Sequence, residues 1–578
     1  MVYSWLVLSL WAGLCRSQAT IEVNTDLGKI KGLEMTSRLG EKFWSFRGIR
    51  YAQAPIGDLR FQPPQPQNAW KPLVYDATAD GPICPQFTTE TSEISEDCLR
   101  LNVYTKNLND KKPVIVYLHP GGFYSFSAQS KSVAGPQSFM DRDIVLVTVN
   151  YRLGSLGFLA TGTAEAVGNA GLKDQVIALR WVQQHIRKFG GDCDSVTLWG
   201  YSAGSFSIGL HIMSPMSKGL FHRAIMMSAS PLGQFNYQNN QLNLAEKQAR
   251  LLNCPEKPIK NMVKCLKAKP TMDYVDTIRD MFEFEWNPVL NWVPVIEPDF
   301  GQERFIADDP YKVMESGNIH KVPLIIGITE YEFYYLAFLY SSGQNGLGYL
   351  YWGFTHPQSF DFSLLLSDTL RNETQRERFN ADFATYAPIY FLYERETQKS
   401  LTASEAFRKK YFENQPLVYP NSLERFGQLY SDGLICFEYY RYLHMILKHV
   451  PVYTYMFNYK GRYSFFINPD TNQTYGAMHH DELLYLLHMP ILTPLFTKTD
   501  PENDVIERLT RLWSEFAKNS YVSSDPNNPN DVYLKDIDWC LYTEKDKKYL
   551  EIGNELKLKS GGIYTDRLQL WNSLFPLK

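Results

Sequence analysis

The sequence lacks a strong charge of either sign, because 58 Lys and Arg residues oppose 62 Asp and Glu residues for a net charge of −4. This balance offers no electrostatic reason to expect nucleic acid or an anionic lipid surface as a partner. Beyond the N-terminus, no apolar run is long enough to cross a bilayer. The C-terminal residues carry no hydrophobic tail, lipidation motif or endoplasmic-reticulum retention signal. We therefore predict no stable membrane anchor and no nucleic-acid partner.

Metal-site signatures, internal repeats, low-complexity tracts and charge blocks are also absent from the sequence. Because no cysteine–histidine spacing is typical of a metal site, we predict no metal ion and no cofactor. Nothing in the composition marks a domain boundary. We expect residues 18–578 to form a single domain, and the sequence carries no signal for an oligomeric state.

The N-terminal residues 1–17 contain an apolar run, Val-Tyr-Ser-Trp-Leu-Val-Leu, that is too short to span a bilayer and is followed by small and polar residues. We interpret these residues as a secretory signal peptide and expect a secreted, extracellular protein. Two glycosylation sequons suit a secreted surface. They begin at Asn372 and Asn472.

Export would permit disulfide bonds. The chain has eight cysteines, of which Cys15 would leave with the signal peptide. Two locally spaced pairs, Cys84 with Cys98 and Cys254 with Cys265, could close short loops worth about 3 kcal/mol each. Three thiols remain, so at least one of them is expected to be unpaired: Cys193, Cys436 and Cys540.

Apolar runs typical of buried strands alternate with helical patterns along the chain. Residues 171–189 place apolar side chains three and four positions apart on one helical face, and the glycine pair 190–191 provides a C-cap. This alternation predicts an α/β fold, with a mostly parallel sheet, helices on both faces and active residues at the carboxyl ends of the strands. Segments 235–290 and 340–450 are interpreted as helical and loop insertions that roof the site. The expected buried strands are residues 114–119, 144–150, 196–199, 224–227, 324–328 and 452–456.

Residues 196–205 form an apolar strand that runs into Gly-Tyr-Ser-Ala-Gly and then a helical stretch. This arrangement is typical of a nucleophile elbow, in which serine occupies a strained strand-to-helix turn. The glycines two residues on either side let neighbouring elements approach closely. We predict that Ser202 is the nucleophile and that the N–H of Ala203 faces the developing oxyanion.

A serine nucleophile needs a general base and an acid that orients the base, and α/β-hydrolases carry them in the order serine, acid, histidine. A glycine-led loop that enters an acid-capped helix presents two adjacent candidates for the base, His479 and His480. The strand at residues 323–328 is followed by two candidates for the acid, Glu330 and Glu332. Spacing and chemistry favour neither member of either pair.

The oxyanion hole is expected in a glycine-rich turn after an earlier strand. Residues 116–124, Val-Tyr-Leu-His-Pro-Gly-Gly-Phe-Tyr, occupy that place. Glycine lets backbone N–H groups point together at one oxygen without obstruction by a Cβ atom. Gly121 and Gly122 are therefore the candidate donors, although a tight turn after Pro120 is the simpler explanation.

Several further motifs occur in order along the chain: Phe46-Arg-Gly-Ile-Arg-Tyr-Ala, Leu59-Arg-Phe, Ser95-Glu-Asp-Cys-Leu-Arg-Leu-Asn-Val-Tyr, Asn150-Tyr-Arg-Leu-Gly and Gly476-Ala-Met-His-His-Asp-Glu-Leu. With these motifs and the elbow, the chain resembles the type-B carboxylesterase/lipase family from about residue 21 almost to the C-terminus. This family includes cholinesterases and insect esterases, and the chain looks most like secreted arthropod carboxylesterases.

The resemblance implies an α/β-hydrolase fold with insertions over an active-site gorge, and it chooses between the open alternatives. Its Gly-x-x-x-x-Glu pattern places the acid at Glu332, and its Gly-x-x-His-x-Asp-Glu-Leu pattern places the base at His479. It also implies oxyanion donors at the N–H groups of Gly121, Gly122 and Ala203, bridges Cys84–Cys98 and Cys254–Cys265, and a structural ion pair between Arg60 and Glu96.

The chain departs from the family pattern at four places. Pro120 replaces the first glycine of the oxyanion loop, which is not a main donor position, so we expect the geometry to survive. His480 stands where a small residue is usual, and Tyr201 stands where cholinesterases carry glutamate. The loop between Cys84 and Cys98 is short and lacks the cation-binding tryptophan of cholinesterases. A choline ester is therefore not the expected substrate.

We predict a serine carboxylesterase that hydrolyses small apolar esters through an acyl-enzyme. A lipase or a hormone- or odorant-ester hydrolase is the alternative within the family. A non-catalytic adhesion or binding protein is the alternative outside enzymes, although the serine, glutamate, histidine and both glycines are all present. Five aromatic residues could line an apolar gorge or pack in the core: Phe284, Trp286, Trp292, Phe333 and Tyr335.

Overall fold

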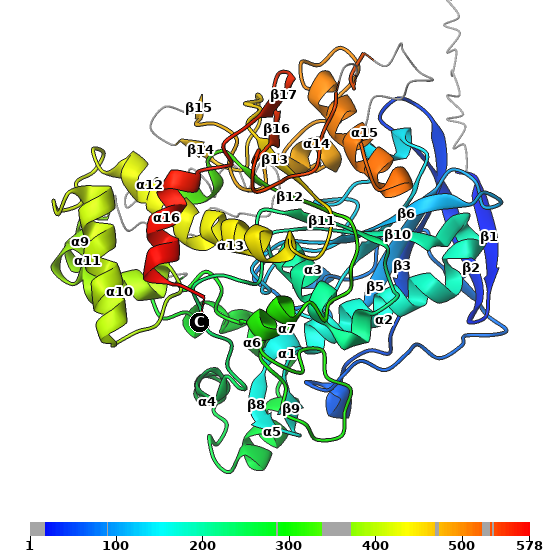
Figure 1. The fold of residues 1–578 in the computed structure, drawn as a ribbon. Coiled ribbons are helices and arrows are strands. Elements are labelled where there is room, and N and C mark those ends of the chain that lie inside the picture. The colour runs from blue at the N-terminus through cyan, green and yellow to red at the C-terminus, as the bar shows by residue number, and fades with distance from the viewer. Residues whose placement is uncertain are drawn as a thin grey trace, which may run out of the picture.

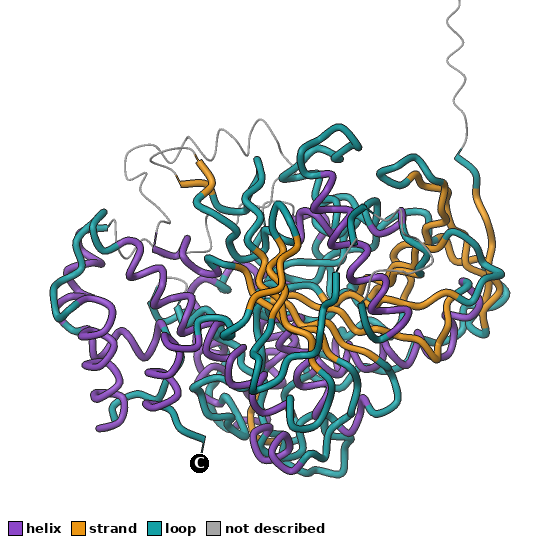
Figure 2. Tube along the Cα trace, turned by 45° about the horizontal axis from the view of Figure 1, so that its top comes forward, coloured by secondary structure: helices purple, strands orange, loops and turns teal. Residues whose placement is uncertain are grey.

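A large mixed sheet forms the centre of the protein, with helices on either side (Figures 1 and 2). The computed structural model describes residues 18–88, 91–284, 287–337, 372–468, 473–522, 532–534 and 537–577. Within these ranges, thirteen strands join the sheet in the order β1-β2-β3-β5-β7-β6-β10-β11-β12-β13-β16-β17, with β4 paired to β2. Seven consecutive strands, from β7 to β16, run parallel.

The strands of this sheet are β1 (Thr20–Thr25), β2 (Gly28–Thr36), β3 (Lys42–Arg50), β4 (Val74–Asp76), β5 (Arg100–Thr105), β6 (Lys112–Leu118), β7 (Val145–Val149), β10 (Gly191–Tyr201), β11 (Arg223–Met227), β12 (Leu324–Thr329), β13 (Val452–Phe457), β16 (Tyr549–Ile552) and β17 (Leu556–Lys559). Two short pairs lie outside it: β8 (Ala160–Thr163) with β9 (Ala166–Val167), and β14 (Ile467–Asn468) with β15 (Gln473–Thr474). The six predicted strands correspond to β6, β7, β10, β11, β12 and β13. The predicted α/β fold with a mostly parallel sheet is therefore confirmed.

The helices are α1 (Gly154–Phe158), α2 (Ala170–His185), α3 (Ala203–Met213), α4 (Leu242–Leu251), α5 (Ile259–Lys267), α6 (Thr271–Asp276), α7 (Pro310–Ser316), α9 (Glu373–Ala381), α10 (Phe383–Tyr390), α11 (Gln398–Phe412), α12 (Leu423–Ser431), α13 (Phe437–Ile446), α14 (Leu483–Leu486), α15 (Asn503–Asn519) and α16 (Thr565–Leu574). The helix predicted for residues 171–189 is α2 with a 3-10 turn, and Gly190 ends it at φ 79°. Helices α4 to α6 fall in the first predicted insertion, and α9 to α13 fall in the described part of the second.

Alternation of side chains along the central strands builds two cores, one on each face of the sheet. On β6, Val114, Val116 and Leu118 join the core that contains α2, α3 and α13. Ile115 and Tyr117 point the other way, into the core that contains α14 and α15. Because both faces are covered, the parallel strands are mostly apolar, as buried parallel sheets are.

The two ends of the sheet differ in what surrounds them. The antiparallel strands β1, β2 and β3 form one edge, where Figure 1 shows them far from the helical end of the molecule. At the opposite end, α9 to α12 gather beside α16 (Figure 1). The N-terminal antiparallel strands were not predicted from the sequence, because several of their residues face solvent and their apolar pattern is short.

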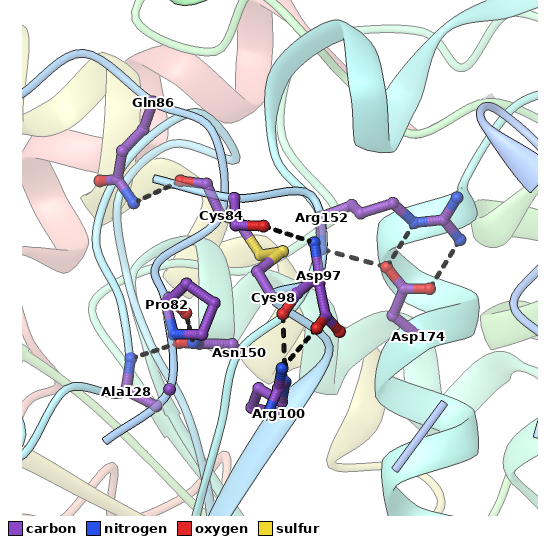
Figure 3. Close-up of a disulfide and its surroundings, with 12 residues drawn as sticks. Pro82, Cys84, Gln86, Asp97, Cys98, Arg100, Ala128, Asn150, Arg152 and Asp174 are labelled. Carbon is purple, nitrogen blue, oxygen red and sulfur yellow. Dashed lines mark hydrogen bonds and ion pairs between the residues drawn. A yellow bond between two sulfur atoms is a disulfide. The ribbon is translucent and has the colours of Figure 1, made fainter. Parts of the chain in front are cut away.

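Both disulfides are present, Cys84–Cys98 and Cys254–Cys265. Figure 3 shows the first bridge beside a buried ion pair in which Arg152 Nε donates to Asp174 Oδ2 at 2.8 Å. Arg60 and Glu96 form the expected ion pair, with Nε donating to Oε2 at 2.8 Å. The other cysteines in the described ranges are free thiols: Cys193, Cys436 and Cys540.

Three sequence predictions concern processing and membranes. No helix in the described ranges is both long enough and apolar enough to cross a membrane. Asn372 is exposed and caps the N-terminus of α9, where its side-chain oxygen accepts from the N–H of Gln375 at 3.1 Å. Asn472 and the predicted signal peptide, residues 1–17, lie outside the described residues.

The Cys84–Cys98 bridge yields a prediction about stability. The bridge links residues 14 apart, so removing it restores chain entropy to the unfolded state worth about 3 kcal/mol. We expect Cys84→Ser/Cys98→Ser to lower the urea midpoint of unfolding by a corresponding amount. Cys193→Ser, at a free thiol, serves as the control and should leave the midpoint unchanged. Equal midpoints for the double variant and the wild type would contradict this expectation.

Candidate active site

Ser202 lies at the sharp turn between β10, which ends at Tyr201, and α3, which begins at Ala203. Its backbone has φ 52° and ψ −119°, a conformation that residues with a Cβ atom rarely adopt. Two hydrogen bonds hold it there. The Ser202 N–H donates to the carbonyl of Met227 at 2.8 Å, and the N–H of Phe206 donates to the Ser202 carbonyl at 2.8 Å. The predicted nucleophile therefore occupies an elbow between strand and helix.

The glycines of the elbow make the close crossing of strand and helix possible. A Cβ atom on Gly204 would lie 2.1 Å from the carbonyl oxygen of Leu118, at the end of β6. A Cβ atom on Gly200 would lie 2.6 Å from the carbonyl carbon of Gly204. Both contacts are with backbone atoms that cannot rotate away, so a side chain at either position would push the elbow from the sheet.

Glu332 and His479 meet beside this elbow, although 147 positions separate them. Glu332 follows β12 and begins the 3-10 segment Glu332–Ala337, and His479 lies in the loop between β15 and α14. His479 Nδ1 is 2.5 Å from Glu332 Oε2, and the His479 N–H donates to the Glu332 carbonyl at 3.0 Å. The other carboxyl oxygen accepts from the N–H of Thr329 at 2.7 Å.

The neighbouring candidates take different places. Glu330 uses its backbone, since its N–H donates to Phe457 and its carbonyl accepts from the hydroxyl of Tyr564. His480 lines the same cavity as His479, but its ring packs against Phe126 at a centroid distance of 5.5 Å. The structure thus pairs Glu332 with His479 and leaves Glu330 apart from them.

Burial shapes the charge of the Glu332–His479 pair. Both side chains are fully buried, so desolvation raises the pKa of Glu332 to about 8 and lowers the pKa of His479 well below 6.5. Both pKa shifts disfavour the charged form of the side chain, the carboxylate of Glu332 and the imidazolium of His479. Phe333 stacks on the His479 ring at 4.3 Å and excludes water from one face. In the described part of the chain nothing bonds to His479 Nε2, which leaves that atom available as a proton acceptor.

The glycine turn after β6 faces the same space. Gly121 and Gly122 have φ 108° and 56°, both in the region that favours glycine. The carbonyl of Gly121 accepts from the N–H groups of Tyr124 and Ser125 at 2.9 and 3.0 Å, which closes the turn. A Cβ atom on Gly121 would lie 2.1 Å from the carbonyl oxygen of Ser125. Ala203 is the first residue of α3, where N–H groups have no partner within the helix.

These groups line one cavity, whose empty volume is about 620 Å³ when the part open to solvent is included. Its walls are mostly apolar, and they come from the elbow, the glycine turn, the histidine loop, the loop after β11 and the start of α13. The lining residues are Gly121, Gly122, Tyr124, Ser125, Ser202, Ala203, Phe206, Ala229, Val289, Leu290, Phe333, Leu434, Ile435, Glu438, His479 and His480.

The aromatic residues singled out from the sequence are divided between cavity and core. Phe333 lines the cavity. Trp292 is buried in the core with Tyr124 and Phe282, and Phe284 packs against the ring of Tyr386. Trp286 and the side chain of Tyr335 lie outside the described residues.

Several lining residues were missed from the sequence, and the most distant in the chain from Ser202 among them are Leu434, Ile435 and Glu438. They lie more than 230 positions after Ser202, in a stretch without a motif, and only packing of the second insertion against the sheet brings them to the cavity. Within the described ranges, no group of three or more His, Cys, Asp or Glu side chains is arranged to hold a metal ion.

Known proteins are similar in sequence to this chain over almost its whole length. A model of the carboxylesterase family matches residues 19–571. The chain is similar to the juvenile hormone esterase of Tribolium castaneum, at 32% identity over 530 residues that cover 87% of this chain and 84% of that protein. It is also similar to venom carboxylesterase-6 of Apis mellifera, at 31% identity over 537 residues that cover 89% of each chain. Esterase FE4 of Myzus persicae is 32% identical over 547 residues, covering 90% of this chain and 89% of that protein.

Proposed function

Since this chain belongs to the carboxylesterase family and is a carboxylic ester hydrolase of the α/β-hydrolase fold, we propose that Ser202, His479 and Glu332 carry out the hydrolysis. One observation supports this assignment above the others. The strained elbow serine and the glutamate-bound histidine, from opposite halves of the chain, line the same cavity.

The proposed reaction runs through an acyl-enzyme. His479 Nε2 takes the hydroxyl proton of Ser202 as Oγ attacks the ester carbonyl carbon. The tetrahedral intermediate collapses, the bond to the alcohol oxygen breaks, and Nε2 returns the proton to the departing alcohol. Water then attacks the acyl-enzyme by the same route and releases the acid. Glu332 accepts a hydrogen bond from the Nδ1–H of His479. This bond keeps the imidazole in the tautomer whose Nε2 is unprotonated.

Three backbone N–H groups are proposed to stabilise the oxyanion, those of Gly121, Gly122 and Ala203. They adjoin the nucleophile in the cavity, and the two glycines have the backbone freedom that convergent donors require. Donors of this kind are each worth on the order of 10²–10³ in kcat in other hydrolases.

The substrate is proposed to be a small apolar ester. The cavity walls are mainly aliphatic and aromatic, and one similar protein is named a juvenile hormone esterase, which supports an apolar ester rather than a charged one. A lipid ester or an odorant ester is the narrower alternative. A non-catalytic adhesion role is not favoured, because the elbow serine and its partners are all in place.

We further propose that the protein is secreted after removal of residues 1–17. Two disulfides suit an oxidising compartment. Asn372 is exposed, and its cap uses only the side-chain oxygen, so the amide nitrogen is free to carry a glycan while the helix stays capped. Glycosylation at Asn372 and at Asn472 therefore remains a proposal.

Removal of the nucleophile tests the proposed function. Ser202→Ala should lower kcat for p-nitrophenyl butyrate by on the order of 10⁶, because Ser202 attacks the carbonyl directly. The melting temperature should stay close to that of the wild type. Ser316→Ala, at an exposed serine that ends α7, is the matched control and should retain full activity. Turnover by the Ser202 variant at the wild-type rate would disprove the assignment.

The pH profile tests the base and the acid. The active form of His479 is the neutral imidazole, and burial lowers its pKa, so kcat/KM should stay high at pH 6.5 and fall only at lower pH. An acid limb centred above pH 6.5 would contradict this. Glu332→Gln should lower kcat by about 10⁴, because the amide favours the wrong tautomer. Glu330→Gln, at the alternative acid, should change kcat little.

Expression of the full chain in insect cells tests secretion. Protein purified from the medium should begin near Gln18, as read by N-terminal sequencing, because the preceding residues are removed on export. Peptide N-glycosidase should increase its electrophoretic mobility, and the increase should be smaller for Asn372→Gln. Protein that stays inside the cells and still begins at Met1 would refute the proposal.

A further inference from the structure

A second carboxyl group lines the cavity and takes no part in the proposed reaction. Glu438 lies in the first turn of α13, and its side chain is fully buried. It follows a π-helical turn, Asp432–Cys436, in which Leu434 and Ile435 also line the cavity. Because π-helical turns interrupt regular helices and occur frequently at functional sites, this wall of the cavity is a place to look for a binding role.

We propose that Glu438 determines substrate specificity: its carboxyl group donates a hydrogen bond to an oxygen of the substrate remote from the scissile ester. Favoured substrates would then carry an ether or carbonyl oxygen in the acyl or alcohol chain. This inference rests on the proposed function, because it names the substrate class of that same cavity.

The surroundings of the carboxyl group leave it without a strong partner. Its Oε1 atom has no hydrogen-bond partner in the described part of the chain. The other oxygen accepts only a long bond, 3.5 Å from the N–H of Ser230. Arg441, one turn further along α13, instead donates to the carbonyls of Gly233 and Phe575. Both terminal nitrogens of the Arg441 guanidinium group thus bond to backbone carbonyls and not to Glu438.

The backbone makes room for this carboxyl group. A Cβ atom on Gly233 would lie 2.9 Å from Glu438 Oε1, so the absence of a side chain at that position keeps the site open. The Ser230 hydroxyl donates to the Glu438 carbonyl at 2.7 Å and holds the start of α13 in place. The loop after β11 therefore fixes where the carboxyl group lies.

Burial favours the protonated form of Glu438, which can donate a hydrogen bond. Burial raises its pKa well above 4.5, because no described cation pairs with it to stabilise the charged form. A neutral carboxyl group has one O–H to donate, and leaving such a group unsatisfied in a dry cavity is costly. Four aliphatic side chains of the cavity have no hydrogen-bond acceptor: Val289, Leu290, Leu434 and Ile435. The proposed acceptor for the Glu438 carboxyl group is therefore an oxygen of the substrate.

The same loop connects Glu438 to the nucleophile. The Met227 carbonyl holds the N–H of Ser202, and Ser230, three residues later, holds Glu438. Three residues span at most roughly 10 Å. Because Ser202 and Glu438 line one cavity and their supports lie this close in the chain, one substrate can reach both, and the acceptor oxygen belongs in its acyl or alkyl chain.

Paired esters test this inference in the full-length protein. One series compares p-nitrophenyl hexanoate, heptanoate and octanoate with their 4-oxo, 5-oxo and 6-oxo counterparts. A second compares alkyl acetates with acetates of ether alcohols of equal length. After correction for reactivity toward hydroxide, at least one oxygen-bearing ester should show a kcat/KM about tenfold above that of its hydrocarbon counterpart. Most of the preference should appear in KM, since the contact forms before the chemical step.

Variants assign the preference to Glu438. Glu438→Leu should reduce the ratio of the two kcat/KM values about tenfold, whereas Glu438→Gln, which keeps an N–H donor, should retain most of it. Glu405→Leu, at an exposed position of α11, applies the same chemical change away from the cavity and should leave the ratio unchanged.

Three outcomes would overturn the inference. They are a wild type that prefers no oxygen-bearing ester, a Glu438→Leu variant that keeps the ratio, and a stronger preference for an ester bearing an ammonium group, which an ionised carboxylate would select. If the Glu438→Leu variant does not fold, the kcat/KM ratios of the wild type for the paired esters still test the inference. Loss of hydrolysis for every ester would instead count against the proposed function, so the two failures are distinguishable.

Discussion

The close crossing of β10, α3 and β6 beneath Ser202 is the constraint on which the rest of the site depends. Ser202 keeps a left-handed backbone only because both of its backbone polar groups are bonded and the glycines at 200 and 204 allow backbone atoms to approach. Once the elbow is held against the end of β6, the glycine turn that follows β6 must lie beside it. The nucleophile and the proposed oxyanion donors are therefore placed by one packing event.

The parallel sheet brings the remaining groups to the same edge. β12 and β13 run parallel to β10, so the loops that leave their carboxyl ends meet near the elbow and join Glu332 to His479. Burial then sets the chemistry, because it disfavours charge on both partners and keeps the imidazole neutral. The same burial raises the pKa of Glu438, so the apolar cavity disfavours the charged form of both glutamates.

Much of the fold could be predicted from local patterns. Six buried strands, α2 with its glycine cap and the mostly parallel sheet follow from apolar periodicity, turn chemistry and the strand–helix alternation. The antiparallel strands β1, β2 and β3 escaped prediction, because strands with residues in solvent carry a weaker apolar signal. Among candidate site residues, spacing by itself could not separate His479 from His480 or Glu332 from Glu330, since each pair lies in a single loop. The single-domain boundary, the signal peptide and the glycans at Asn372 and Asn472 stay predictions.

The sequence by itself determined the elements that neighbouring residues encode: the elbow, the glycine turn, the buried strands and the cysteine pairs of short loops. These depend on interactions between residues close in the chain, which a pattern can report. The family resemblance chose His479 and Glu332, but only the tertiary structure brought these two side chains into contact and placed Leu434, Ile435 and Glu438 around the cavity. Those contacts join segments more than a hundred residues apart, and their protonation follows from burial, which no local pattern contains.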